Sequence, residues 1–130
     1  TVLVKDIRPS GEDEDAFFGD KLIYDRYLSG EELTSKQAEA ILPTRDDMAE
    51  VFRFLKGHNG FRFSYEMLWF RLAYRPSFGK MMICLDVMTE FGFIKREFDG
   101  KNFVITLSDR MEKKNFDNSE IIKKLKDRIF

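Results

Sequence analysis

The sequence predicts an α+β protein, organised as a winged helix of three helices with a two-stranded β wing. Two observations predict this fold. Apolar residues recur at helical spacing in three successive segments between residues 43 and 92, and two strand-like runs joined by Asp99 and Gly100 follow them. The composition agrees with a folded domain, because 43% of the 130 residues are hydrophobic and Gly and Pro contribute only 8 and 3 residues.

Residues 1–42 are expected to be the end of a preceding domain followed by an acidic helical linker. Val2 to Ile7 form an extended apolar run that Pro9 breaks. A lone strand cannot satisfy its own backbone, so this run either pairs with a sheet of this chain or closes a preceding domain of a longer protein, and we expect the second. The acidic run 12–15 is expected to be solvated and not a cation site, because a calcium loop alternates its ligands around a central Gly.

Two short helices are predicted within this first segment. One covers residues 20–28 and ends at Gly30, which suits the left-handed position after a helix. The other runs to Leu42 and begins with a capping box, in which the Thr34 hydroxyl and the Gln37 side chain exchange hydrogen bonds with free amides.

Residues 43–110 are expected to form the winged helix itself. Thr44 and Asp47 begin its first helix, whose apolar stripe is Met48, Val51, Phe52 and Leu55 and which ends at the turn 57–60. A very short strand follows at residues 61–63. Ser64 then caps a second helix running toward Arg75, where Pro76 ends it.

Ser77 is expected to cap the third helix, 78–91, and Gly92 to end it. Residues 93–98 and 101–107 then form a hairpin, joined by Asp99 and Gly100 in a type I′ turn. Residues 111–130 are expected to be an amphipathic tail helix. The part from Asp117 onward carries its apolar stripe, Ile121, Ile122, Leu125 and Ile129, and because a helix of about 11 residues is marginal alone, it should dock on the body of the domain.

Catalytic and metal chemistry are not expected in these 130 residues. One His and one Cys are too few for a structural zinc site, and a single Cys excludes an internal disulfide. His58 lies in a predicted turn, and Cys84 lies mid-helix among apolar neighbours that make a thiol inert. We therefore expect no cofactor here. No apolar run reaches the roughly 20 residues that span a bilayer, so no membrane contact and a cytoplasmic location are expected.

The charge distribution and the third helix argue against sequence-specific DNA binding. The net charge is −5 for residues 1–44, +2 for 45–101 and +2 for 102–130, which gives no strongly basic stripe. The third helix contains no Arg, Asn or Gln, the side chains that form bidentate contacts with bases. Because this helix is apolar nearly all round, we expect it to be buried between its own domain and something else.

Two weaker signals favour contact with nucleic acid. The candidate phosphate contacts are Arg62, Lys80, Lys95, Arg96 and Lys101, although a solvated hairpin would look the same. Aromatic residues next to cations are typical of surfaces on which single-stranded bases stack. The pairs are Phe52 and Arg53, Phe61 and Arg62, and Phe70 and Arg71. Most Phe residues also fit the predicted core, which is the alternative for these rings.

Four segments, in this order, resemble the C-terminal region of RecJ, the family of single-stranded-DNA-specific exonucleases with a DHH core, in its longer bacterial form. The segments are Leu3-Val4-Lys5-Asp6-Ile7-Arg8-Pro9, Leu42-Pro43-Thr44-Arg45-Asp46-Asp47, Cys84-Leu85-Asp86-Val87 with Glu90-Phe91-Gly92-Phe93-Ile94, and Lys113 through Leu125. The first is similar to the closing strand of the family's OB-like domain. Asn115 and Phe116 depart from the Asp and Leu that are usual in the family's closing segment.

This resemblance implies a noncatalytic accessory part of a 5′ to 3′ exonuclease involved in DNA repair and recombination. Manganese or magnesium would be held by the parent's catalytic core, whose Asp and His clusters have no counterpart here. The expected partners are that core, other DNA repair proteins and, weakly, single-stranded DNA, so the role would be domain docking, partner binding or substrate guidance. The alternative from the element order and the hairpin cations is a free-standing winged-helix DNA-binding transcriptional regulator.

Overall fold

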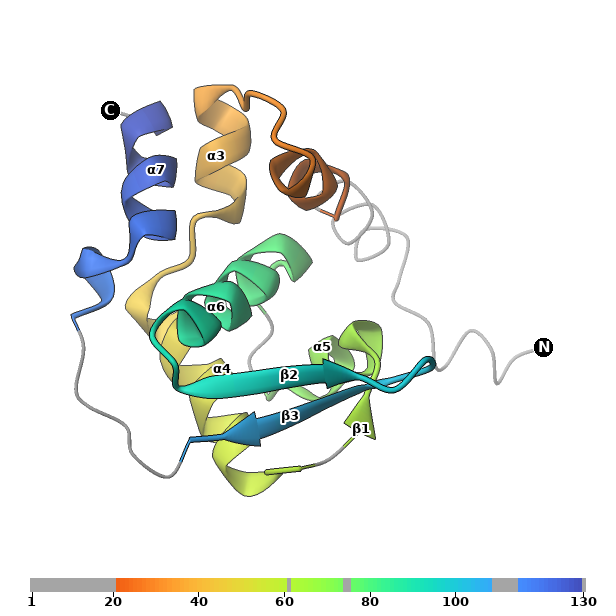
Figure 1. Cartoon of the computed structure of the whole chain (residues 1–130). Coiled ribbons are helices and arrows are strands. Elements are labelled where there is room, and N and C mark those ends of the chain that lie inside the picture. The colour runs from red at the N-terminus through yellow and green to blue at the C-terminus, as the bar shows by residue number, and fades with distance from the viewer. Residues whose placement is uncertain (1–20, 61, 74–75, 109–114, 130) are drawn as a thin grey trace.

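The computed structural model describes residues 21–60, 62–73, 76–108 and 115–129. The expected strand at residues 2–7 and the acidic run at 12–15 lie outside these residues. The described helices are an unlabelled helix at residues 21–28, then α3 (Ser35–Ile41), α4 (Arg45–Gly57), α5 (Tyr65–Arg71), α6 (Phe78–Glu90), the 3-10 turn η1 (Phe116–Asn118) and α7 (Glu120–Ile129). The strands are β1 (Arg62–Phe63), β2 (Ile94–Phe98) and β3 (Phe103–Leu107), as Figure 1 shows.

The protein is therefore a mixed α+β structure with one small antiparallel sheet among its described residues. The strand order is β1-β3-β2, so the hairpin formed by β2 and β3 is extended by the two residues of β1. Phe63 and Phe98 both lie opposite Phe103, and Arg96 lies opposite Ile105. Side chains alternate across a strand, so one sheet face carries Ile94, Arg96, Phe98, Phe103, Ile105 and Phe63 and the other carries the solvent-facing residues.

The helix starts follow the local sequence signals. Thr34 forms the expected capping box with Gln37, and Thr44 forms a second one with Asp47. Ser64 and Ser77 accept the backbone N–H groups of Met67 and Lys80 and so cap α5 and α6. Each of these side chains satisfies an amide that has no partner within its own helix.

The second helix of the predicted winged helix is shorter than expected. It ends at Arg71 and not near Arg75, with Leu72 in an extended conformation. A contact distant in sequence explains this end. Glu50 of α4 accepts a hydrogen bond of 2.9 Å from the N–H of Ala73, and the side chain of Leu72 is 4% exposed. The chain leaves the helix early because α4 supplies a partner for the turning backbone.

The hairpin prediction is confirmed, but the predicted turn is wrong. A two-residue turn at Asp99 and Gly100 would pair Phe98 with Lys101, whereas the structure pairs Phe98 with Phe103. Gly100 has a φ of 96°, and no described residue other than glycine has a positive φ, so the type I′ geometry is absent there. Instead the carboxylate of Asp99 accepts the N–H groups of Lys101 and Asn102, which shifts the connection by two residues.

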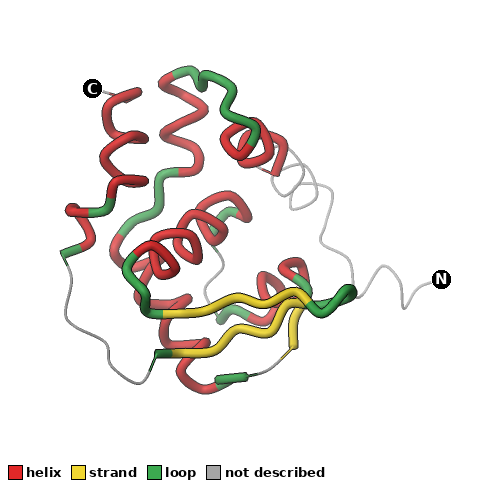
Figure 2. The backbone as a smooth tube through the Cα atoms, viewed as in Figure 1, coloured by secondary structure: helices red, strands yellow, loops and turns green. Residues whose placement is uncertain are grey.

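Helix α6 is the centre of the fold. The sheet and α4 lie on one side of it, and α3 and α7 lie on the other, with helix 21–28 beside them (Figures 1 and 2). Nine of its residues are buried: Phe78, Gly79, Met81, Met82, Ile83, Cys84, Leu85, Val87 and Met88. The sequence predicted burial on both sides, and within the described residues the second cover comes from this chain's own ends.

The C-terminal helix docks on this body as predicted. Ile122 and Leu125 of α7 are 0% and 2% exposed, and α7 contacts both α3 and α6. The start of α7 is held by α6, because the Glu90 carboxylate accepts the backbone N–H groups of Glu120 and Ile121. Buried Ser119 caps the same helix by accepting the N–H of Ile122. The ends of the described chain thus share one hydrophobic core with its middle.

Candidate functional site

The most exposed aromatic surface of the described residues lies at the closed end of the hairpin. Phe98 is 60% exposed, although it is a large apolar side chain. Its ring lies 4.9 Å from that of Phe103, measured between centroids, and Phe103 stacks on Tyr65 at 4.2 Å. We call these three rings the hairpin-end cluster. They form a row that begins in the solvent and ends against helix α5.

The strand register explains why this cluster is accessible. Phe98 and Phe103 lie on the same sheet face as the core residues Ile94 and Ile105 but nearer to the turn, Phe98 four residues beyond Ile94 and Phe103 two residues before Ile105. Ile94 and Ile105 are 4% and 2% exposed, whereas Phe98, next to the turn, is 60% exposed and Phe103 is partly buried against Tyr65. The apolar face of the hairpin is therefore longer than the core that covers it.

Arg96 lies on the same face, between the core and Phe98, and it is bound internally. Its guanidinium donates to Asp86 Oδ1 at 2.8 Å and to the Tyr65 hydroxyl at 3.3 Å. The hydroxyl of Tyr24, on helix 21–28, donates to Asp86 Oδ2 at 2.7 Å. The Arg96 and Asp86 side chains are only 18% and 14% exposed. This network joins helix 21–28, α6, β2 and α5.

The environment of this network shifts several pKa values. Burial alone would lower the pKa of Arg96, but the hydrogen bond and charge of Asp86 outweigh it and raise that pKa. Burial and the Asp86 carboxylate raise the pKa of Tyr24, and burial raises that of Tyr65. The network is thus a fixed ion pair with two neutral hydroxyls around neutral pH.

The structure separates the five candidate phosphate contacts. Arg62 is exposed and forms an ion pair of 3.3 Å with Asp99, which follows Phe98 in the chain, and Lys101 is exposed in the same turn. Lys95 lies on the opposite sheet face and pairs with Glu97 at 3.0 Å. Lys80 lies in the first turn of α6 and not on the hairpin. Arg62 and Lys101 are therefore the two exposed cations of this set at the turn end of the hairpin, and pairing with Val104 places Arg62 on the sheet face opposite to Phe98 and Phe103.

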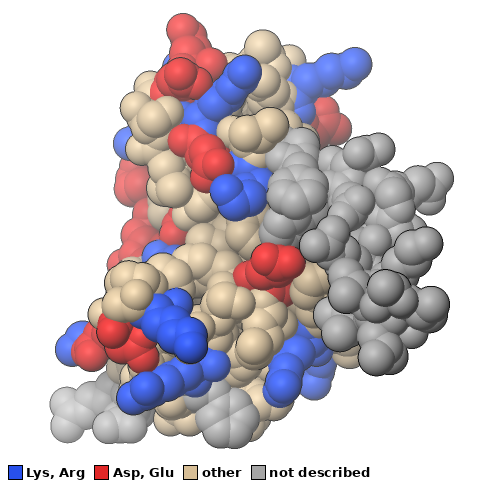
Figure 3. Space-filling view, turned by 90° about the vertical axis from the view of Figure 1, so that its right-hand side faces the viewer, with Lys and Arg blue, Asp and Glu red and all other residues tan. Residues whose placement is uncertain are grey.

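Charged side chains of both signs are interspersed over this side of the molecule. Figure 3 shows Lys and Arg separated by Asp and Glu across the described surface, with no continuous basic stripe on that face. Ion pairs account for part of this pattern, because Arg62 pairs with Asp99 and Lys95 with Glu97. This mixture of charges is not the strongly basic surface that binds a long DNA duplex.

The aromatic residues that neighbour cations in the sequence lie elsewhere. Phe52 and Phe70 pack against the core, and Phe70 contacts the Trp69 ring edge-on at 5.2 Å. Arg53 is held by Glu50 through two hydrogen bonds of 2.8 Å. Phe61 lies outside the described residues. The signal that would have identified the hairpin-end cluster is the presence of Phe98 and Phe103 on both sides of a predicted turn.

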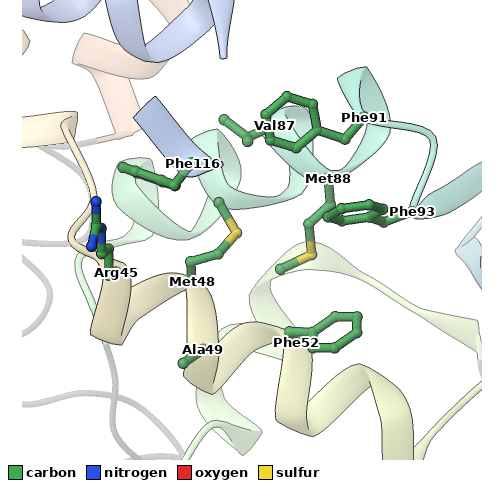
Figure 4. Close-up of a pocket in the computed structure, with 9 residues that line it drawn as sticks. All are labelled: Arg45, Met48, Ala49, Phe52, Val87, Met88, Phe91, Phe93 and Phe116. Carbon is green, nitrogen blue, oxygen red and sulfur yellow. The ribbon is translucent and has the colours of Figure 1, made fainter. Parts of the chain in front are cut away.

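A second surface feature is an apolar pocket between α4 and α6, with a volume of about 550 Å³. Figure 4 shows Met48, Ala49 and Phe52 lining it from α4 and Val87 and Met88 from α6. Phe91, just after α6, and Phe93 and Phe116 complete its lining. Of the described residues that line it, Arg45 alone is charged, and its guanidinium is bound to Asp117 at 2.9 Å. The pocket offers volume and apolar surface but little polar chemistry.

Cys84 and His58, the candidate nucleophile and base, both take part in packing or helix capping. The Cys84 side chain is fully buried, and this burial together with the Asp47 and Asp86 carboxylates raises the pKa of its thiol. His58 caps the end of α4, its Nδ1 lies 2.9 Å from the Phe54 carbonyl oxygen, and its ring stacks on Phe54. Among the described residues no three His, Cys, Asp or Glu side chains converge as metal ligands, so they do not fit a metal pair.

Comparison of the chain with protein-family models, curated proteins and solved structures gave no significant match. Among the helices that the structure describes, none combines the length and apolar character that crossing a bilayer requires.

Proposed function

We propose that this chain is an accessory domain that contacts single-stranded DNA through its hairpin-end cluster. In this proposal Phe98 stacks on an unpaired base, Phe103 and Tyr65 support its ring from behind, and Arg62 and Lys101 lie beside the neighbouring phosphates. The observation that carries the proposal is the row Phe98–Phe103–Tyr65, with its outermost ring 60% exposed. Aromatic side chains near cations are the usual platform for single strands.

We further propose a winged-helix fold and the role of substrate guidance in a RecJ-type exonuclease. The order α4, β1, α5, α6, β2 and β3 agrees with a winged helix in which the hairpin is the wing. The resemblance in sequence supports the family, and a cytoplasmic DNA repair role goes with it. Hydrolysis would then belong to a manganese- or magnesium-dependent core, because the described side chains here do not fit a metal pair.

The cover over α6 argues against the alternative of a free-standing regulator. In such a protein α6 would be the helix that enters the major groove and presents polar side chains to bases. Here Ile83, Cys84 and Val87 are each 0% exposed, and α3 and α7 pack on this helix. Reading duplex DNA through α6 would require those helices to leave, which would expose a large apolar surface.

The decisive experiment measures fluorescence anisotropy of a labelled fifteen-nucleotide oligothymidine with Phe98→Ala. Stacking contributes about 1–3 kcal/mol per base in alanine substitutions, so we expect the affinity to fall about 5- to 150-fold. Leu28→Ala is the matched control, because Leu28 is 61% exposed and lies beside α7 and away from the hairpin. Thermal unfolding of both variants should stay close to that of the unmodified chain, since both residues are mostly solvated.

The salt dependence gives a second readout of the same site. With two phosphate contacts, from Arg62 and Lys101, the logarithm of the affinity should fall with the logarithm of the salt concentration at a slope of about −1.4. Equal binding by the Phe98→Ala and Leu28→Ala variants would contradict the proposal. So would duplex DNA bound as tightly as the single strand, because paired bases present no free face to Phe98.

A further inference from the structure

We infer that Asp86 occupies, within the folded chain, an anion site that DNA phosphate would otherwise take, and that it thereby withholds Arg96 from the proposed DNA-binding site. The inference rests on the proposed function, because Arg96 matters for DNA only if the hairpin-end cluster binds it. It assigns to Asp86 the role of a positioning residue that limits affinity.

The donors around Asp86 form a complete anion site. The Arg96 guanidinium donates to one carboxylate oxygen at 2.8 Å, and the Tyr24 hydroxyl donates to the other at 2.7 Å. The Tyr65 hydroxyl lies 3.3 Å from the same guanidinium and orients it. Guanidinium and hydroxyl groups that converge in this way are the usual partners of a phosphate as well as of a carboxylate.

The position of Arg96 makes this competition relevant. Arg96 and Phe98 lie two residues apart on the same face of β2, and Tyr65 contacts both Arg96 and the ring of Phe103. A phosphate next to a base stacked on Phe98 would lie within reach of the Arg96 side chain. In the folded chain that side chain is only 18% exposed and its charge is balanced by Asp86.

Helix 21–28 holds this arrangement closed. Tyr24 is 5% exposed and packs in the common core, with Ile23 and Tyr27 partly buried beside it, so its hydroxyl is held against Asp86 by this packing. Asp86 in turn lies on α6, which has more buried residues than any other described helix. The ion pair between β2 and α6 is thus mostly buried and hydrogen-bonded, and separating Arg96 from Asp86 costs more free energy than breaking an exposed ion pair.

The experiment compares oligothymidine binding by four variants. Asp86→Asn keeps the side-chain shape and its hydrogen-bond acceptor but removes the charge that balances Arg96. We expect it to raise the affinity about threefold or more and to steepen the salt slope by about 0.7, the value for one added phosphate contact. Arg96→Gln alone should leave affinity and slope unchanged, and the double variant should return to the unmodified values.

The charge control is Asp127→Asn. It changes the net charge by the same amount, but Asp127 is exposed and lies on α7, away from the hairpin (Figure 1). If it raises the affinity as much as Asp86→Asn does, the inference is overturned. A loss of binding in Arg96→Gln as large as in Phe98→Ala also overturns it, because Arg96 would then already contact DNA. If Asp86→Asn fails to fold, the binding of Arg96→Gln alone still tests whether Arg96 contacts DNA in the unmodified chain.

The binding measurements distinguish a failure of this inference from a failure of the proposed function. Binding that depends on Phe98 but not on Asp86 overturns the inference alone. Absence of binding in the unmodified chain and in every variant overturns both.

Discussion

Ile122→Ala tests whether α7 is an integral part of the cover over α6. Ile122 is 0% exposed, and α7 contacts α3 and α6. The substitution removes three buried carbon atoms, which costs about 2.5 kcal/mol at ~0.8 kcal/mol per methylene group. The cavity left behind adds to this, so the total loss of unfolding free energy should lie at about 3–5 kcal/mol. Domains of this size have about 5–15 kcal/mol in all, so the effect is large.

Cys84 supplies the assay, because it is the only cysteine and is 0% exposed at the centre of the same helix. A thiol reagent reaches it only when the cover opens, so the labelling rate reports the population of open molecules. A loss of about 3 kcal/mol corresponds to labelling about a hundredfold faster. The midpoint of denaturant unfolding should fall in parallel, since Ile122 and the residues of α6 belong to one core.

Lys124→Ala is the control, because Lys124 lies on the exposed face of the same helix. Its substitution should leave both the labelling rate and the unfolding midpoint nearly unchanged. The reasoning is refuted if Ile122→Ala behaves like Lys124→Ala in both measurements. That result would mean that α7 contributes nothing to the burial of α6 in solution.

Two further predictions concern single positions. Gly92 has a φ of 77° and an added Cβ would meet no atom within 4 Å, so Gly92→Ala should lower stability by about 1–2 kcal/mol through backbone strain alone. Gly57→Ala in α4 is the control, because the added Cβ meets no atom there either and Gly57 needs no left-handed backbone. Thermal unfolding should show this variant as stable as the unmodified chain or more stable. If both variants lose the same stability, backbone strain at Gly92 is not the cause. Hydrogen bonds from Lys126 and Arg45 lower the pKa of Asp117. The ionised Asp117 therefore stabilises the fold at a pH above the ordinary carboxyl pKa, and this stabilisation is lost as the pH falls through the lowered pKa. The unfolding midpoints of the Asp117→Asn variant and the unmodified chain should therefore differ at pH 7 and converge as the pH falls below the ordinary carboxyl pKa and through the lowered one, and a constant difference would contradict this.

Local signals predicted the helix starts, because capping needs only a few residues of sequence. The side chains of Thr34, Thr44, Ser64 and Ser77 each accept a hydrogen bond from the amide three positions further on, as side chains of these types do at helix starts generally. Gly92 as the end of α6 follows from the same kind of reasoning. The three helices, the hairpin and the docking tail were predictable to within a few residues on this basis.

The errors came from contacts that a local pattern does not contain. The end of α5 depends on Glu50, which lies 23 positions before Ala73. The hairpin turn shifted because the Asp99 carboxylate competes for the amides that a type I′ turn would orient differently. In both cases an acidic side chain supplies an acceptor that outweighs the intrinsic preference of the backbone.

The candidate site was predictable only in part, for a related reason. Alternation along β2 places Arg96 on one face of the sheet, but it does not predict that Asp86, ten positions earlier on α6, accepts a hydrogen bond from Arg96 there. The sequence therefore grouped Arg96 with Lys95 and Lys101 as equivalent cations, whereas the structure leaves Lys101 exposed and binds Arg96 internally. Apolar periodicity likewise predicted a doubly buried α6 without naming the helices that cover it.

The balance between stacking and charge bears on whether such a domain would act alone. A chain with a net charge of −1 and two exposed cations at the turn end of the hairpin would gain little from counterion release, which supplies most of the affinity of stand-alone DNA-binding proteins. Stacking on one exposed ring would add about 1–3 kcal/mol, which by itself corresponds to weak binding. Tethering to a second DNA-binding surface would raise the effective concentration of the strand at the hairpin and make so weak a contact useful. The modest chemistry of the hairpin end thus favours an accessory role beside a catalytic core over independent regulation.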